Sequence, residues 1–245
     1  MKVKKKTVIL TAAGLLTVWL LADLYISNFV PAATRREIRL ARLPEAFSGF
    51  RVAHLSDLHA TSFGKDNAAL ISLLEGENPD IIVITGDLID RGDFGERPGQ
   101  LDWAEKTVSR LVQIAPVYYV TGNHEWGAEY KAARKGDPRP IPRLKEIIDR
   151  HGAVWLDNDY LVIRRGGDAI VLAGITDPNG PADQVDPLPM LSDIRAEMNE
   201  PFILALSHRY DRLDEYAQWG LDLVLTGHAH GGLVRLPFTD GLYGP

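Results

Sequence analysis

Short apolar runs alternate with amphipathic stretches along this chain from residue 50 onward. The run 80–85 is continuously apolar after its first residue, as expected for a strand that is covered on both faces. Residues 66–77 instead place Leu70, Leu73 and Leu74 at helical spacing. Strands that alternate with helices in this way predict an α/β layered fold with the helices outside.

The same pattern locates the other elements. We expect strands at 51–56, 80–85, 117–121, 154–156, 161–164, 169–173, 202–207, 223–226 and 234–236. We expect helices at 66–77, 102–114, 141–151, 192–199 and 212–219. The pair Gly166–Gly167 predicts a hairpin turn, and two polar stretches rich in glycine and proline, 92–100 and 127–142, are predicted to be loops.

The N-terminal run 7–30 is apolar except for Asp23 and follows a cluster of lysines. It is long enough to cross a bilayer, which takes roughly 20 mostly apolar residues. A signal peptide also begins with basic residues, but residues 31–33 offer only a poor cleavage site, so we favour an uncleaved anchor. A buried helix is the remaining alternative, and the terminal position beside the lysines argues against it.

These features divide the chain into three predicted parts. Residues 1–31 are a membrane anchor or signal segment, 32–49 a linker and 50–245 one folded domain. Arginines in the linker nearly balance the N-terminal lysines, so charge says little about orientation. N-terminal anchors usually leave the N-terminus inside the cell, so we expect a single span in the bacterial cell membrane with the folded domain outside the cytoplasm.

Composition narrows the chemistry. The formal net charge of −6 gives no global basic field, so no nucleic acid is expected as a partner. The chain has no cysteine, which excludes disulfides, thiolate zinc sites and cysteine nucleophiles. A metal site here has to use carboxylates, imidazoles, amides and water. The oligomeric state is left open.

Polar residues capable of binding metal follow five of the predicted strands, each at the carboxyl end. In chain order these residues are Asp57 and His59, Asp87 and Asp90, Asn123 and His124, His208, and His228 and His230. That edge of an open α/β sheet is where binding sites are built. The clusters therefore predict one shared site.

The mixture of ligand types favours a pair of divalent ions. Two such ions lie roughly 3.5–4 Å apart in two-metal hydrolases and need a bridging ligand, for which Asp87 beside Gly86 is the natural choice. Asp57 and His59 would point the same way on an extended chain, as would His228 and His230. Carboxylate, imidazole and amide ligands suit manganese, iron or zinc better than calcium or magnesium. The predicted ligands are Asp57, His59, Asp87, Asn123, His208, His228 and His230.

Each cluster has an ordinary structural explanation when it is taken alone. Asp57 could cap a helix, Asn123 could occupy a turn, and His208 could be a satisfied core histidine. The clusters all lie at equivalent strand ends, and the chain has seven histidines in total. Coincidence is therefore a poor explanation of the pattern. The two histidines outside the set, His54 and His151, are predicted to be structural.

The motifs resemble those of the calcineurin-like metallophosphoesterases, in particular its membrane-associated bacterial branch. The resemblance covers residues 50–236 and rests on Asp57-x-His59, Gly86-Asp87-x-x-Asp90-Arg91, Gly122-Asn123-His124-Glu125, His208 and Gly227-His228-x-His230. It implies that 50–245 is the metallophosphoesterase domain, folded as a two-sheet β sandwich flanked by helices. It also implies that family members continue for further strands, so this domain, which stops at Pro245, could be short at its C-terminal end.

The resemblance also implies the roles of individual residues. Asp57, His59, Asp87 and His230 would bind the first ion, and Asp87, Asn123, His208 and His228 the second. His124 would contact the phosphate and protonate the leaving group, and Asp90 would orient His124. The implied reaction is phosphoester hydrolysis by a metal-bound hydroxide, with His124 as general acid.

Two other functions stay open at this point. One is a metal-dependent enzyme of another class, such as an amidohydrolase, although asparagine is an uncommon ligand there. The other is a membrane-anchored, non-catalytic scaffold that retains a relic metal site, against which the intact His124 and Asp90 argue.

The resemblance and the anchor together suggest a phosphodiester or a lipid-linked (pyro)phosphate as substrate. We also hypothesise that the stretch after Glu125 forms a cap that contacts substrate phosphates or lipid headgroups. The residues concerned are Trp126, Tyr130, Lys131, Arg134, Lys135, Arg139 and Arg143. A solvated charged loop is an equally good explanation of this stretch.

Overall fold

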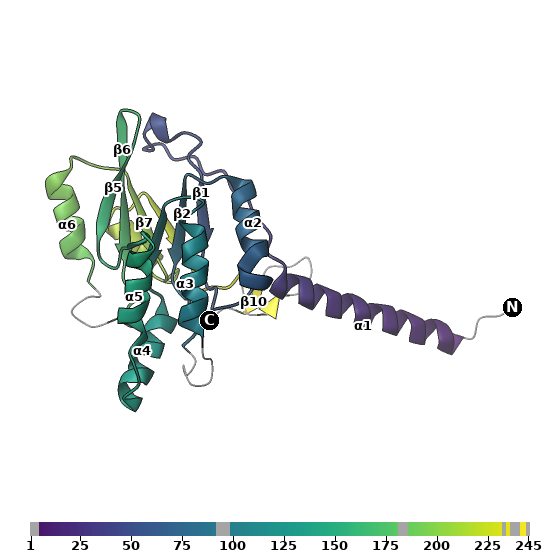
Figure 1. The fold of residues 1–245 in the computed structure, drawn as a ribbon. Helices are drawn as coiled ribbons and strands as arrows, with labels where there is room; N and C mark the ends of the chain where they lie inside the picture. Colours follow the sequence, from purple (N-terminus) through teal and green to yellow (C-terminus); the bar gives the residue numbers. More distant parts are fainter. Residues whose placement is uncertain (1–4, 92–98, 181–185, 232–233, 236–240, 244–245) are drawn as a thin grey trace.

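Two sheets packed face to face, with helices on their outer surfaces, form the folded domain of this computed structural model (Figure 1). The structure describes residues 5–91, 99–180, 186–231, 234–235 and 241–243. The predicted strand residue 236 and most of the predicted loop 92–100 therefore lie outside the described residues. The described part confirms the predicted α/β fold and its two-sheet arrangement flanked by helices.

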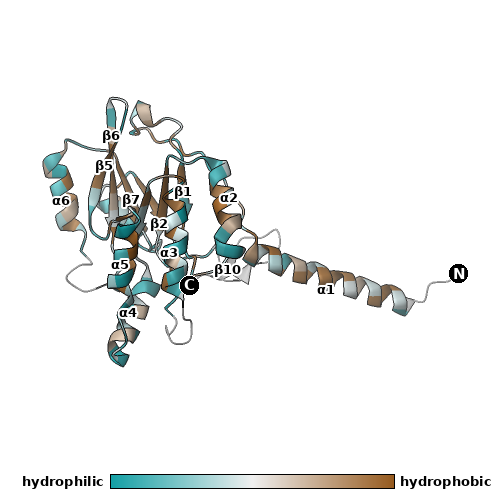
Figure 2. Cartoon of the chain, viewed as in Figure 1, coloured by the Kyte–Doolittle hydropathy of each residue, from teal (hydrophilic) through white to brown (hydrophobic). Residues whose placement is uncertain are grey.

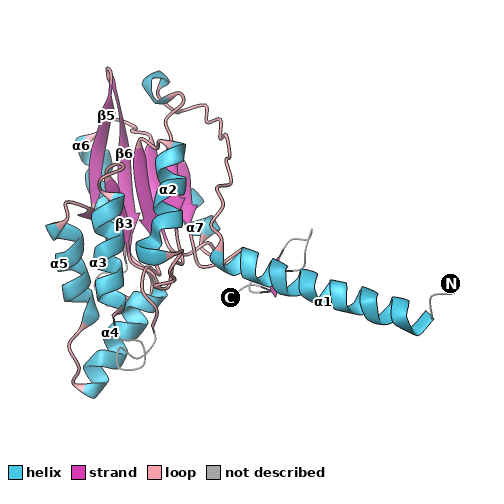
Figure 3. Ribbon diagram, turned by 45° about the vertical axis from the view of Figure 1, so that its right-hand side comes forward, coloured by secondary structure: helices cyan, strands magenta, loops and turns pink. Residues whose placement is uncertain are grey.

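The first sheet is entirely parallel, in the order β1-β2-β3-β4. Its strands are β1 (Val52–Leu55), β2 (Ile81–Thr85), β3 (Val117–Val120) and β4 (Val154–Trp155). The connecting helices are η2 (Lys65–Asn67), α2 (Ala68–Glu77), α3 (Gln100–Leu111), α4 (Asn123–Lys135) and α5 (Pro140–Arg150). In Figure 3 helices α2, α3 and α5 lie along one face of this sheet.

The second sheet is mixed, in the order β5-β6-β7-β8. Its strands are β5 (Tyr160–Arg165), β6 (Asp168–Ile175), β7 (Ile203–Ser207) and β8 (Leu223–Thr226), and its helices are α6 (Leu188–Glu197) and α7 (Leu213–Gln218). Strands β5 and β6 form an antiparallel hairpin across Gly166–Gly167, as predicted, whereas β6, β7 and β8 are parallel. A separate antiparallel pair joins β9 (Val234–Arg235) and β10 (Gly241–Tyr243).

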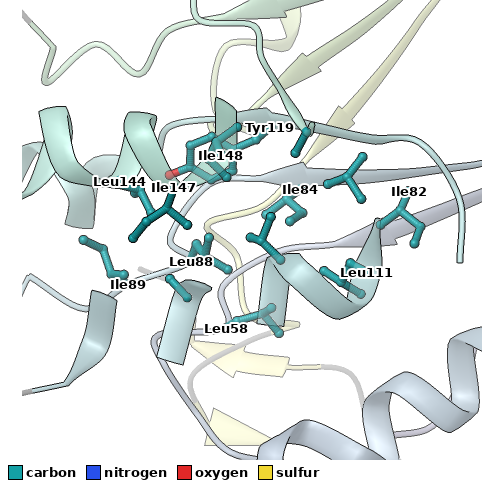
Figure 4. Packing of buried hydrophobic residues seen from close by; sticks show 14 of the residues in the cluster. Leu58, Ile82, Ile84, Leu88, Ile89, Leu111, Tyr119, Leu144, Ile147 and Ile148 are labelled. Atoms are coloured by element: carbon teal, nitrogen blue, oxygen red, sulfur yellow. The ribbon is translucent and has the colours of Figure 1, made fainter. Parts of the chain in front are cut away.

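Strand β2 shows why the run 80–85 is continuously apolar. All five of its residues are buried, because one face packs on the helices and the other on the second sheet. Ile82 and Ile84 belong to the core beneath the helices, which Figure 4 shows from close by. Ile81 and Val83 belong to the core between the two sheets. The alternation follows from the two-residue period of a strand.

Helix α4 corrects the prediction of a loop at 127–142. Alanine, glutamate, lysine and arginine in this stretch are strong helix formers, and Gly136 ends the helix with a φ of 72°. Gly127 does not mark a loop. A Cβ atom there would lie 3.1 Å from the Cβ of Arg91, so this glycine allows the helix to pack closely.

The same correction removes most of the support for a phosphate-binding cap. Helix α4 begins at the candidate site with Asn123 and runs away from it, so Lys135 lies roughly 18 Å along the helix axis from Asn123. Trp126 is buried and donates its indole N–H to Thr121. The guanidinium of Arg139 is paired with the buried carboxylate of Glu129.

Replacing Arg139 with alanine is expected to destabilise the fold rather than to act on substrate. Among the described residues, Glu129 would keep the amide of Ile141 alone as a partner for its buried carboxylate, which costs about 1–3 kcal/mol. Urea unfolding should show this loss for Arg139→Ala and a smaller change for Arg143→Ala, an exposed arginine on α5. Equal stability of the two variants would contradict the role of the Arg139–Glu129 pair.

The N-terminal helix α1 (Lys5–Phe29) projects from the domain (Figure 2), and its large apolar side chains are exposed along its length. Within its segment Lys6–Phe29, an 18-residue window has a mean hydropathy of 1.9 and no buried residue, so the helix is long and apolar enough to cross a membrane. The helix contributes nothing to the core of the domain.

The predicted linker packs against the domain from Arg35 onward. Arg35 pairs with Glu77 at 2.7 Å, and Arg42 pairs with Asp222 at 2.7 Å. The amide of Ala46 donates to Asp168, and Phe47 is buried in the core between the sheets. We call residues 35–47 the docked segment. The domain boundaries and the short C-terminal end stay predictions.

Candidate active site

The carboxyl ends of β1, β2, β3, β7 and β8 bring all the predicted site residues together. Two groups of side chains place their ligand atoms within 4.8 Å of one another: Asp57, His59, Asp87 and His230, and Asp87, His208 and His228. Asn123 joins the second group, because its Oδ1 lies 2.9 Å from Nε2 of His208. A third group contains His59, Asp90 and His124.

Left-handed backbone at the candidate ligands corrects the expectation of extended pairs. The φ angles of Asp57 and His59 are 54° and 47°, and those of His228 and His230 are 69° and 52°. Asp87, with a φ of 52°, shares this conformation. Such angles cost of order 1–3 kcal/mol each for residues other than glycine and cluster at functional sites. The chain curls around the site, so each ligand is aimed by a turn and not by the pleat of a strand.

Apolar neighbours hold these turns in place. Leu58 lies between Asp57 and His59, and Leu88 follows Asp87; both are buried in the core beneath the helices (Figure 4). The alternation of polar and apolar residues thus anchors each loop from below while its polar side chains face the site.

The first group is arranged around the ring of His59. Its Nε2 lies 3.3 Å from Nε2 of His230 and 3.8 Å from Oδ2 of Asp87. His230 Nε2 in turn lies 3.4 Å from Oδ1 of Asp57. A hollow of about 370 Å³ lined by Asp57 and His230 opens beside this group.

Asp87 connects the first group to the second. Its Oδ2 lies 3.3 Å from Nε2 of His208 and 3.8 Å from Nε2 of His124. Its Oδ1 accepts the backbone N–H of His124 at 2.8 Å. One carboxylate thus faces both groups, which is the position that a ligand shared by two ions requires.

Orphaned polar atoms test whether the residues suit metal ions. Oδ2 of Asp87 and Nδ1 of His59 are buried and have no hydrogen-bond partner among the residues that the structure describes. Such groups are costly to bury unless something pairs with them. Imidazole nitrogens and carboxylate oxygens that converge on common points are a donor set for divalent transition metals. The described residues therefore fit the metal pair that the sequence predicts, although the identity and the sharing of the ions stay predictions.

Glycines make this crowding possible. A Cβ atom at position 122 would lie 2.3 Å from Oδ1 of Asp87, and one at position 227 would lie 1.8 Å from Oγ of Ser56. At Gly86, where φ is 88°, it would lie 2.6 Å from the amide nitrogen of Gly122. These loops can approach one another only because those positions lack side chains.

Charge couples the buried residues at the centre. Burial disfavours both charged forms, yet the ion pair between Oδ2 of Asp87 and Nε2 of His208, 3.3 Å apart, raises the pKa of His208 and lowers the pKa of Asp87. Burial lowers the pKa of His59, partly offset by the negative charge of Asp87. The buried carboxylate of Asp87 therefore stays ionised and stabilises a positive charge beside it, here that of His208.

His124 and Asp90 form a separate pair at the edge of the ligand set. Nδ1 of His124 lies 2.9 Å from Oδ1 of Asp90 and 3.1 Å from the amide nitrogen of Arg91. Nδ1 cannot donate a hydrogen to the carboxylate of Asp90 and accept one from the amide of Arg91 at the same time. The shorter contact joins it to a carboxylate, so we assign the proton to Nδ1, which leaves Nε2 facing the site.

Glu125 ties the loops together from beneath. Its buried carboxylate accepts the backbone N–H groups of Asp87, Ile89 and Gly122 at 3.0, 3.1 and 2.8 Å. Burial and the neighbouring charge of Asp87 raise the pKa of Glu125 to about 7. The glutamate of the Gly-Asn-His-Glu motif is thus a support for the β2 and β3 loops.

Sequence reasoning missed Asp177 and Arg209. Asp177 follows the carboxyl end of β6, and Arg209 follows His208. Nε of Arg209 lies 2.8 Å from Oδ2 of Asp177, and its Nη1 lies 2.8 Å from Nε2 of His228. The signal available in the sequence was Asp177, an acidic residue after the end of a sixth strand.

Asp157 lies in the same polar layer and gives the fold a pH dependence. Its carboxylate accepts the N–H and the hydroxyl of Thr121, yet burial and the nearby charge of Asp177 raise its pKa from 3.8 to about 6. A carboxyl group with a raised pKa binds its proton more tightly in the folded state. Its contribution to stability is therefore fully present below pH 4 and is lost as the pH rises to 6.

Replacing Asp157 with asparagine should remove that loss. The quantity compared is the free energy of unfolding of the wild type minus that of Asp157→Asn, which should fall between pH 4 and pH 7. Because Asp157 stays partly accessible, the fall should be at most about 3 kcal/mol. Urea unfolding at several pH values measures this difference, with the exposed Asp159→Asn as control. A difference that does not change with pH would show that folding does not raise the pKa of Asp157.

The two histidines predicted to be structural lie outside the ligand groups. Nε2 of His54 lies 2.7 Å from the hydroxyl of Thr85, and Nε2 of His151 lies 3.3 Å from Glu105. Neither ring belongs to the candidate metal groups among the described residues.

Comparison with known proteins agrees with this geometry. A family model described as calcineurin-like phosphoesterase matches residues 50–232. The uncharacterized metallophosphoesterase YkuE of Bacillus subtilis is 26% identical over 226 residues, which cover 90% of this chain and 71% of YkuE. Phosphodiesterase YaeI of Escherichia coli is 26% identical over 214 residues, which cover 84% of this chain and 70% of YaeI.

Two further matches are a membrane protein and a solved structure. A transmembrane protein with metallophosphoesterase domain from Danio rerio is 29% identical over 234 residues; the match covers 87% of this chain and 49% of that protein, so this chain spans about half its length. The solved structure of the sulfate thiohydrolase SoxB from Thermus thermophilus superposes with a TM-score of 0.51 at 14% identity, over 79% of this chain and 50% of SoxB. At that identity the likeness concerns the fold alone.

Proposed function

This chain belongs to the calcineurin-like phosphoesterase family, and from that membership we propose that it is a two-metal-dependent hydrolase of phosphodiesters. The observation that carries the proposal is the shared carboxylate of Asp87, whose buried Oδ2 accepts no hydrogen bond from the described residues and faces both ligand groups. The name of the Escherichia coli relative, a phosphodiesterase, supports this choice of bond.

The ligands of the ion pair are Asp57, His59, Asp87, Asn123, His208, His228 and His230. Divalent ions held there would supply Lewis acidity toward the phosphoryl oxygens and an activated water. Manganese, iron and zinc are the candidates. The backbone turns and the glycines fix the geometry of these side chains before any ion binds, which lowers the cost of assembling the site.

His124 acts as the general acid in this proposal. As the oxygen of water forms its bond to phosphorus, the bond to the leaving oxygen breaks, and Nε2 of His124 delivers a proton to that oxygen. Asp90 accepts the Nδ1 proton of His124 at 2.9 Å, which orients the ring and stabilises its charged form. The backbone N–H of His124 donates to Asp87, so the acid is fixed relative to the ligand set.

We propose a lipid-linked phosphodiester or pyrophosphate as substrate class and α1 as a membrane anchor. The Danio rerio relative is described as a transmembrane protein, which supports an anchor. Only residues 30–34 separate α1 from the docked segment, and they reach at most roughly 20 Å. A domain held so close to a bilayer would work at headgroup level, and we place it outside the cytoplasm.

The test is hydrolysis of bis-p-nitrophenyl phosphate by the full chain in detergent micelles. The protein is first stripped with a chelator and then given manganese, iron or zinc. We expect no turnover without metal and turnover after metal is restored. A folded protein that binds metal but turns over neither this ester nor a phospholipid diester would overturn the proposal in favour of a non-catalytic scaffold.

A further inference from the structure

We propose that Arg209, held in place by the buried carboxylate of Asp177, binds a phosphoryl oxygen of the substrate. This inference rests on the proposed function, since it assigns a phosphate contact to the same site. Neither residue belongs to the predicted ligand set or to the His124–Asp90 pair.

The two residues meet because their strands are neighbours. Strands β6 and β7 are parallel, and Ile175 lies opposite Ser207 at their carboxyl ends. Asp177 and Arg209 each lie two residues beyond that pair, so both emerge at the edge that carries the site. Nε of Arg209 then donates to Oδ2 of Asp177 at 2.8 Å.

Contacts at both ends fix the arginine. The side chain of Asp177 is fully buried, and its second oxygen accepts the N–H of Asn179 at 2.8 Å. The backbone carbonyl of Arg209 accepts the hydroxyl of buried Tyr216 at 2.6 Å. With Nε donating to Asp177 and Nη1 directed at His228, the other N–H groups of the guanidinium are the donors that a ligand in the site can reach.

The guanidinium is in contact with the candidate ligand His228. Its Nη1 lies 2.8 Å from Nε2 of that ring, and the arginine side chain keeps 17% of its surface exposed. A fixed positive charge beside a cation-binding imidazole opposes cation binding. An anion held by both the arginine and the site offsets that repulsion, and phosphate is the anion that the proposed reaction supplies.

The stability of the fold gives no comparable reason for the pair. Burying a carboxylate and a guanidinium costs more desolvation than an apolar pair of similar volume, so a buried ion pair is weak evidence for stability. The planar fork of arginine matches the oxygens of a phosphoryl group, which a lysine would not reproduce. Geometry and charge thus both favour phosphate as the occupant.

The test is calorimetric titration of inorganic phosphate into the manganese-loaded full chain in detergent. Arg209→Gln should weaken phosphate binding by roughly 10- to 100-fold, since a charge-assisted hydrogen bond is lost. Bound manganese, measured by elemental analysis, should stay at the wild-type level. Arg209→Lys, which keeps the charge without the fork, and Asp177→Asn, which frees the arginine, should both give intermediate affinities.

Arg212→Gln is the matched control. Arg212 is also a largely covered arginine paired with a carboxylate, that of Glu215, but it lies outside the ligand groups. Its variant should bind phosphate like the wild type.

Two results would overturn the assignment. One is loss of manganese in Arg209→Gln with unchanged phosphate affinity of the loaded fraction, because Arg209 would then support His228. The other is unchanged affinity in both Arg209 variants. Failure of the proposed function looks different: the wild type would bind phosphate in an Arg209-dependent way and hydrolyse no ester.

Discussion

Asp87→Asn should abolish hydrolysis of bis-p-nitrophenyl phosphate and remove at least one bound ion. Loss of a residue that merely supports a metal ligand costs 10- to 100-fold, so loss of a shared ligand should cost more than roughly 100-fold in kcat. Asparagine can still accept the N–H of His124 through Oδ1, which keeps that loop in place. Its amide hydrogens, however, would replace the lone pairs of Oδ2 that face both groups.

The measurement combines steady-state kinetics with elemental analysis of bound metal, and thermal unfolding confirms that the variant is folded. Asp149→Asn removes an exposed carboxylate that pairs with Lys145 and serves as control. Wild-type metal content and turnover in Asp87→Asn would show that the two groups do not share this carboxylate, and the two-metal proposal would fall.

The location of the candidate site could be predicted from sequence because it depends on a local rule. Each cluster follows a strand that periodicity identifies, and the carboxyl ends of parallel strands meet at one edge. The order of strands was not needed for this. Asp57 and His228 meet across the two sheets, where the N–H of His228 donates to the carboxylate of Asp57, simply because β1 and β8 end at the same edge.

The conformation of the ligands could not be predicted, since it depends on contacts between distant loops. The backbone of Asp57 and His59 is left-handed because their amides donate to the carbonyls of Gly86 and Asp87 on the neighbouring loop. Nothing within the Asp-x-His spacing specifies those partners. Periodicity assumes regular backbone and therefore predicted an extended pair.

The pair of Arg209 and Asp177 was missed for a related reason. The residues are 32 apart in sequence, and only the register of β6 against β7 places them together. Helix α4 was missed because Gly127 and Gly136 suggested a loop, while the close contact that requires Gly127 is with Arg91 on another segment. Long-range contacts thus account for these errors.

His124→Ala should lower kcat by about 100- to 10,000-fold for esters with a basic leaving group and leave the bound metal in place. The backbone N–H that His124 donates to Asp87 survives this change, so the ligand set keeps its support. An acid matters most when the departing oxygen needs a proton. The loss should therefore be much smaller for a p-nitrophenyl ester, whose leaving group departs as a stable anion, than for an alkyl ester of the same diester class.

Comparing the two esters separates proton donation from phosphate binding. A residue that only binds the phosphoryl group would affect both esters equally, because that group is the same in both. Asp90→Asn should strengthen the dependence on the leaving group in the same direction as His124→Ala but to a smaller extent, since the amide orients the ring without stabilising its charged form. His151→Ala, which removes a histidine paired with Glu105 away from the site, should change neither rate. Equal losses for the two esters in His124→Ala would assign His124 to phosphate binding. Water would then be the proton donor to the departing oxygen.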